Sequence, residues 1–126
     1  MRKVKILSVL VLCLFVMACA GLISNSYKSL AISKITYDTA LKATTDFQNK
    51  GLITQIQRDQ INKVAKLFKD AHNVAVDALE IYARTNSVSD KEKLVTAISA
   101  AVSKWADVAK LINAIKPNTV PAKFGE

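Results

Sequence analysis

The chain has 126 residues, with 18 lysines and arginines against 10 aspartates and glutamates, and its formal net charge at pH 7 is +8. This length supports one modest domain and excludes an enzyme with separate cofactor and substrate domains. One histidine and two cysteines are too few for a zinc finger, a haem-attachment site or a disulfide scaffold. Three glycines and two prolines argue against all-β architectures, which need frequent turn residues.

The N-terminal segment has the composition of an export signal. Arg2, Lys3 and Lys5 precede a 13-residue apolar run without charges, Ile6–Ala18. As a helix this run rises about 20 Å, which is too short for the hydrocarbon core of a bilayer but suits the apolar region of a secretory signal. Without this segment the chain has 15 basic and 10 acidic residues, so the net charge of the body is +5.

The end of the apolar run resembles the lipobox of bacterial lipoprotein precursors. Val16-Met17-Ala18-Cys19 follows the pattern of an aliphatic residue, two small residues and a cysteine, except that Met17 is larger than the residue usual there. The resemblance, which covers the leader alone, implies a signal peptide over residues 1–18. It also implies that diacylglycerol alkylates the Cys19 thiol, that the chain is cut before Cys19, and that the new amine is acylated.

Two other outcomes of processing stay open. Residues 18–20 also form a small-x-small site, so signal peptidase could cut before Gly21 and release a soluble protein. Alternatively, the stretch from Ile6 to Ile23 just reaches the lower limit for a spanning helix and is retained as an uncleaved anchor. All three outcomes place the body outside the cytoplasm, because the positive N-terminus stays inside. For a lipidated protein in a Gram-negative envelope, Ala20 in place of aspartate implies the outer membrane.

The body is predicted to be all-α. After a lipidated tether over residues 19–25, we expect helices at about 26–49, 54–84 and 90–116, followed by a flexible tail over 117–126. The two connections are about four residues long, and loops that short make neighbouring helices antiparallel. The sequence therefore predicts an up-down-up antiparallel three-helix bundle.

The second and third helices carry the clearest signals. Thr54 with Gln57 and Ser89 with Glu92 are expected to form capping boxes, and Pro117 ends the last helix. Apolar residues alternate at spacings of three and four, which predicts the faces toward the core. These residues are Ile61, Val64, Phe68, Ala71, Ala75, Ala78 and Tyr82 in the second helix, and Leu94, Ile98, Ala101, Trp105, Val108, Ile112 and Ile115 in the third.

The first helix is less regular. One face, interpreted as the inward one, contains Tyr27, Leu30, Ala31, Tyr37 and Leu41. Three apolar residues fall outside that face: Ile32, Ile35 and Phe47. Either the first helix is buried on two sides, or these residues form a candidate partner face. Alanine supplies 15 of the apolar residues after Ile23, and alanine buries little area, so self-association is an additional expectation.

Residues for catalysis are sparse. His72 is the only candidate general base, and its place at the edge of the apolar seam favours a half-packed, hydrogen-bonded residue. The glycines are isolated, so no phosphate-binding loop is expected, and no serine stands in a nucleophile elbow. Asp70, Asp77 and Glu80 are interpreted as solvated. No enzyme activity, cofactor or metal is expected.

Basic residues on the second helix form a candidate basic face: Arg58, Lys63, Lys66 and Lys69. An ordinary solubilising face is the preferred interpretation. The alternative is a surface that binds anionic lipid headgroups or an acidic cell-wall polymer. Nucleic acid is not an expected partner, because aromatic residues do not alternate with the lysines to form a stacking platform.

A second resemblance concerns the body. The run Tyr37-Asp38 and, further on, Gly51-Leu52-Ile53-Thr54 resembles small uncharacterised helical proteins of bacterial genomes and prophages. It implies no defined activity, although a prophage origin would fit interference with an envelope receptor or with cell-wall lysis. Taken together, the sequence predicts a small envelope-anchored lipoprotein whose helical bundle is a non-catalytic module that binds a protein partner.

Overall fold

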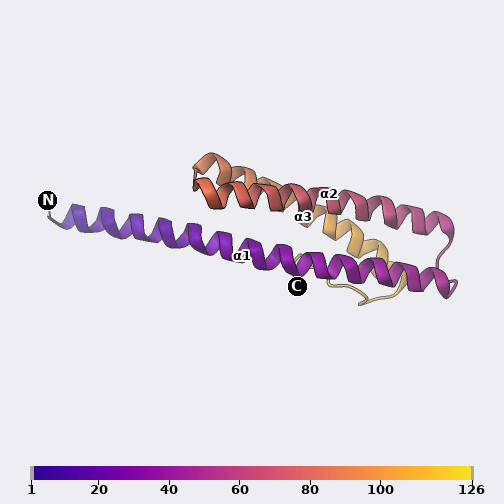
Figure 1. Cartoon of the computed structure of the whole chain (residues 1–126). Coiled ribbons are helices and arrows are strands. Elements are labelled where there is room, and N and C mark those ends of the chain that lie inside the picture. Colours follow the sequence, from indigo (N-terminus) through magenta and orange to yellow (C-terminus); the bar gives the residue numbers. More distant parts are fainter. Residues whose placement is uncertain (1, 126) are drawn as a thin grey trace.

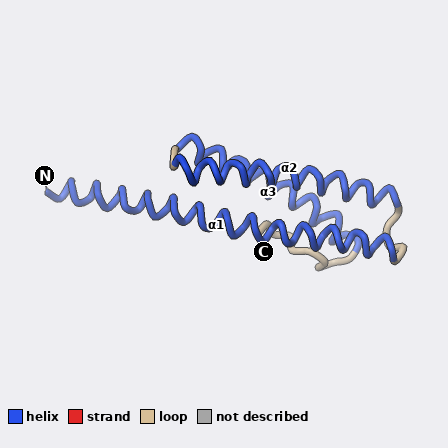
Figure 2. The backbone as a smooth tube through the Cα atoms, in the orientation of Figure 1, coloured by secondary structure: helices blue, strands red, loops and turns tan. Residues whose placement is uncertain are grey.

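The chain folds into three helices that pack side by side (Figures 1 and 2). The structure, a computed structural model, describes the backbone of residues 2–125 and the side chains of residues 21–125. The helices are α1 (Arg2–Asn49), α2 (Gln55–Thr85) and α3 (Val88–Ile115), and residues 2–125 contain no strand. The predicted all-α class and the three-helix bundle are confirmed.

Helix α1 is much longer than expected. Its backbone is helical through residues 19–25, so the prediction of a separate tether there is wrong. Leu22 and Ile23 are half-buried and pack against the core, and this contact gives the segment a reason to stay helical. The side chains of the lipobox-like residues 16–19 lie outside the described part. Within that part, none of the helices has the length and apolarity that a bilayer crossing requires.

The N-terminus of α2 matches its prediction. The backbone N–H of Gln57 donates to the Thr54 hydroxyl over 3.2 Å, and the Thr54 N–H donates to the Gln57 side-chain oxygen over 2.8 Å. This reciprocal pair satisfies two amide groups that the first turn of a helix leaves unpaired. The capping box at Thr54 is therefore confirmed.

The N-terminus of α3 differs from its prediction. The helix is capped by Ser87, whose hydroxyl oxygen accepts a hydrogen bond from the Asp90 N–H over 3.1 Å, and not by Ser89. The Asp90 carboxylate accepts hydrogen bonds from the hydroxyls of Thr85, at 2.6 Å, and of Ser87, at 2.8 Å. Two hydroxyls are thus bound to one carboxylate. Because the N-cap is Ser87, α3 begins two residues earlier than the predicted capping box of Ser89 and Glu92 implies.

The cap predicts a dependence of stability on acid pH. Hydrogen bonds from Thr85 and Ser87 stabilise the charged carboxylate and lower the pKa of Asp90 below its ordinary value. Its contribution is therefore present above the unfolded pKa, about 4, and is lost as pH falls through the lower folded pKa. We expect Asp90→Asn to lose less stability than the wild type between pH 7 and the acid range, measured by urea unfolding. Asp107→Asn, at an exposed site on the same helix, is the control, and an unchanged pH dependence in Asp90→Asn would contradict the prediction.

The inward face of α1 differs from the predicted one. It consists of Ser26, Leu30, Ser33, Ala40, Thr44 and Phe47, which are all buried. The Ser33 and Thr44 hydroxyls donate to the carbonyl oxygens of Leu30 and Ala40 within the helix, each over 2.9 Å. Because these hydroxyls are satisfied locally, burying them costs little. Sequence periodicity missed this face because half of it is small and polar.

The C-terminal segment is packed, so the prediction of a flexible tail is wrong for residues 117–125. Val120 is buried, and the Asn113 side chain holds its backbone. The Asn113 carboxamide oxygen accepts from the N–H groups of Thr119, at 3.0 Å, and Val120, at 3.1 Å, while its nitrogen donates to the Val120 carbonyl over 3.0 Å. The Trp105 indole N–H donates to the Pro121 carbonyl over 2.9 Å.

The same segment joins the two halves of the core. Phe124 packs against both clusters of buried residues, one around Phe68 and Trp105 and the other around Leu79 and Leu94. In Figure 1 the segment leaves α3 and runs back along α1 toward its middle. It therefore covers apolar surface that the three helices leave open. The sequence predicts a flexible tail here because these residues lack helical periodicity.

Candidate binding groove

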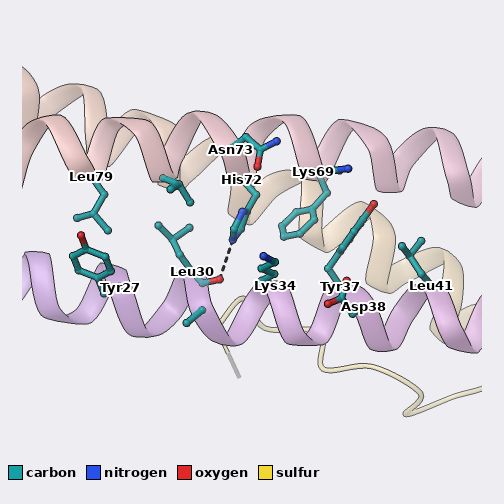
Figure 3. A pocket seen from close by; sticks show the side chains of 13 residues that line it. Tyr27, Leu30, Lys34, Tyr37, Asp38, Leu41, Lys69, His72, Asn73 and Leu79 are labelled. Carbon is teal, nitrogen blue, oxygen red and sulfur yellow. Dashed lines mark hydrogen bonds between the residues drawn. The ribbon is translucent and has the colours of Figure 1, made fainter.

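A groove of about 670 Å³ runs between α1 and α2 (Figure 3). It exists because α2 packs more extensively on α3 than on α1. Residues of α1 form one wall: Tyr27, Leu30, Ala31, Lys34, Tyr37, Asp38 and Leu41. Residues of α2 form the other: Phe68, Lys69, His72, Asn73, Val76 and Leu79. Most of the α1 wall is the set that the sequence assigned to the core.

The floor of the groove is apolar and aromatic. Phe68 and Leu79 are fully buried beneath it, and the ring of Tyr37 lies 5.6 Å from that of Phe68 between centroids. Burial, followed by the negative charges of Asp38 and Asp70, raises the pKa of Tyr37 above its ordinary value. The Tyr37 hydroxyl is therefore protonated at neutral pH and can donate a hydrogen bond.

The rim of the groove carries charge. Lys34 and Lys69 come from opposite walls, with Asp38 on the α1 wall and Asn73 on the α2 wall (Figure 3). Both lysine residues are exposed, so their ammonium groups can reach a ligand seated above the apolar floor. The groove therefore combines an apolar floor with polar groups at its edges, which is the usual composition of a ligand-binding cleft.

His72 links the two walls. Its Nε2 lies 2.9 Å from the Leu30 carbonyl oxygen, which can only accept, so Nε2 carries a hydrogen and donates it. The same carbonyl accepts from the Ser33 hydroxyl. The imidazole also lies against Phe68, with 5.8 Å between ring centroids. The prediction of a half-packed, hydrogen-bonded histidine is confirmed. In the described part of the chain, no cluster of three or more histidine, cysteine, aspartate or glutamate residues could hold a metal ion.

The structure divides the candidate partner face. Ile32 and Ile35 lie on the outer surface of α1, with exposed fractions of 39% and 67%. Phe47 has an exposed fraction of 3% and belongs to the core cluster around Trp105, so its assignment to this face is wrong. Phe47 is buried because it lies on the inward face of α1, three residues after the buried Thr44.

The candidate basic face does not point in one direction. Lys63, Lys66 and Lys69 are exposed, whereas Arg58 is half-buried. Steps of three residues turn a helix by about 300°, so successive lysines are displaced by about 60° around α2. Lys69 consequently lines the groove beside α1, while Lys63 and Lys66 do not.

A second hollow, of about 770 Å³, lies between α2 and α3. Its lining contains no aromatic side chain. The lining residues are Val74, Asp77, Ala78 and Ile81 of α2 and Ser89, Asp90, Glu92, Lys93, Thr96, Ala97 and Ala100 of α3. The α1–α2 groove differs from it in having aromatic residues and a hydrogen bond between its two walls, from His72 to the Leu30 carbonyl, and we take it as the stronger candidate site. The chain matches no protein-family model, no curated protein and no solved structure.

Proposed function

We propose that the protein is a small lipoprotein of the bacterial cell envelope, anchored through Cys19, whose helical bundle binds a protein partner without catalysing a reaction. The lipobox-like Val16-Met17-Ala18-Cys19 supports the anchor. With this anchor, the body of the protein lies outside the cytoplasm, at the periplasmic face of the outer membrane if the cell is Gram-negative. The observation that supports binding is the α1–α2 groove.

The chemistry of the groove indicates the type of partner segment that would fit it. Its volume, about 670 Å³, is within the range of sites that bury a ligand, about 300–1,000 Å³. The floor suits apolar side chains, and Lys34 and Lys69 at the rim suit a carboxylate. His72 is engaged by the Leu30 carbonyl. The groove therefore fits an extended or helical segment of a partner that carries apolar side chains and an acidic group.

The anchor is tested by intact mass and fractionation. We expect mature protein from the membrane fraction to begin at a triacylated Cys19, because the acyl chains contribute about 0.8 kcal/mol per buried methylene and two or more hold a protein stably. The Cys19→Ala protein should lack the acyl mass, because it has no thiol at position 19 to be lipidated. Unmodified protein that starts at Met1 would contradict the proposed anchor, and a chain that starts at Gly21 would indicate free secretion.

Binding is tested by site-specific crosslinking in the native envelope, with a photoreactive amino acid at Ala31, which is exposed on the groove wall. We expect one crosslinked species that is lost on combining Lys34→Glu with Lys69→Glu, because the rim then repels an acidic segment. The matched control combines Lys42→Glu with Lys66→Glu, the same charge change on the same helices outside the groove.

A crosslinking product that responds equally to both charge reversals would contradict a specific role of the groove. A photoreactive residue at Ile35 separates the two candidate surfaces on α1, because Ile35 does not line the groove. A product at Ile35 with none at Ala31 would assign the partner to the outer face of α1.

A further inference from the structure

The join between the leader and the bundle has no linker. Helix α1 continues without a break from the leader into the bundle. Leu22 and Ile23 already pack against the cluster of buried residues that contains Tyr82 and Leu94. The core of the bundle therefore begins only three residues after Cys19.

This short spacing limits how far the bundle can move from a lipid anchor. As a helix, the three residues from Cys19 to Leu22 rise about 4.5 Å. Even fully extended, they reach only about 10 Å. A bundle attached through Cys19 is thus held within about 10 Å of the acylated residue, which is less than the thickness of one helix with its side chains, about 10–12 Å.

One end of the bundle lies at this junction. Figure 1 shows the turn between α2 and α3 at the same end as the projecting part of α1, while the α1–α2 loop is at the opposite end. Tyr82 and Leu94, which flank that turn in the sequence, belong to the cluster that contacts Leu22. The end that faces the anchor is therefore the α2–α3 turn.

The turn has the chemistry of a headgroup contact. Val88 has an exposed fraction of 73%, and the neighbouring Asn86 and Ser89 are exposed uncharged residues that can form hydrogen bonds. Arg84 adds an exposed positive charge. The Asp90 carboxylate, by contrast, is occupied by the hydroxyls of Thr85 and Ser87. Exposed apolar and basic side chains together favour contact with anionic lipid headgroups.

We propose that the α2–α3 turn of the membrane-attached protein rests on the phospholipid headgroups, with the α1–α2 loop at the far end of the bundle. This inference rests on the anchor of the proposed function. The length of α2, 31 residues, separates the two ends by about 45 Å. The groove along α1 and α2 then opens to the side, above the membrane surface.

The experiment compares single cysteines at Val88 and Ile56, whose exposed fractions are nearly equal at 73% and 72% and which lie near opposite ends of the bundle. In the lipidated protein the Cys19 thiol is blocked and Cys13 has left with the leader, so an environment-sensitive fluorophore labels the new cysteine alone. The labelled proteins are reconstituted in vesicles of phosphatidylethanolamine and phosphatidylglycerol. A lipid that carries a nitroxide at its headgroup serves as the quencher.

We expect quenching at Val88→Cys to be several-fold stronger than at Ile56→Cys. Insertion of a flexible glycine-serine linker between Gly21 and Leu22 should reduce the quenching at Val88→Cys to the level of Ile56→Cys. Equal quenching at both sites without the linker would overturn the proposed orientation. Strong quenching at Val88→Cys that survives the linker would overturn the role of the short junction.

Intact mass, measured first on each preparation, separates this inference from the anchor. A triacylated Cys19 with equal quenching at the two sites overturns the orientation and leaves the anchor standing. An unacylated chain overturns the anchor, and with it the premise of the proposed orientation.

Discussion

Phe68→Ala is expected to destabilise the bundle by about 3–5 kcal/mol, the usual loss when a buried aromatic side chain is truncated and leaves a cavity. Phe68 has an exposed fraction of only 1%. Its ring contacts Tyr37 of α1, Trp105 of α3 and Phe124 of the C-terminal segment, with centroid distances of 5.6, 5.3 and 6.4 Å. One side chain thus contacts α1, α3 and the C-terminal segment at once, so its truncation leaves a cavity that all three border.

The measurement is the midpoint of guanidinium or urea unfolding, followed by circular dichroism. Leu67→Ala is the matched control, because Leu67 precedes Phe68 on α2 but is exposed. We expect it to change stability by less than about 0.5 kcal/mol. A Phe68→Ala protein that is as stable as Leu67→Ala would contradict the packing around this ring.

Val120→Asp is expected to release the C-terminal segment and to cost about 2–3 kcal/mol. Val120 is buried, and an unpaired carboxylate in its place would be too costly to desolvate. The segment therefore leaves the core, which loses the burial of Val120, a contribution of about 1.5–3 kcal/mol, together with part of that of Phe124. The hydrogen bond from Trp105 to the Pro121 carbonyl breaks as well.

Trp105 is the only tryptophan, so its fluorescence reports this release directly. We expect a shift of its emission to longer wavelength in Val120→Asp as water reaches the indole. Ala122→Asp introduces the same charge at an exposed position two residues later and should leave both emission and stability near those of the wild type. If the segment were loose, as the sequence alone suggested, the two substitutions would behave alike.

The sequence predicted α2 and α3 well because their signals are local. The seam from Ile61 to Tyr82 repeats at three and four residues, and the capping box at Thr54 needs only neighbours in the chain. The start of α3 was missed by two residues. Ser87 and Ser89 are both possible N-caps by sequence. In the structure Ser87 is the N-cap, and the Thr85 hydroxyl donates to the Asp90 carboxylate across the turn.

The groove was harder to predict. The sequence predicts that Tyr27, Ala31 and Leu41 face inward because they are apolar and share a face, yet they line the groove beside α2. Apolar periodicity identifies a face that avoids water, but it does not say whether a neighbouring helix or a cleft covers that face. His72 was correctly expected to be hydrogen-bonded, although its partner, the Leu30 carbonyl 42 residues away, could not be read from the sequence.

By itself, the sequence determined the helical class, the number of helices in the body and the lipobox-like run at residues 16–19, because each depends on residues close together in the chain. Only the tertiary structure decided the inward face of α1, the packed C-terminal segment and the junction without a linker. Phe47 and Val120 are buried, and Leu22 is half-buried, against residues far away in sequence. A length of 126 residues still allows one domain, and three of its positive charges lie within the first five residues. The fold adds the groove between α1 and α2, at which we propose that a partner binds.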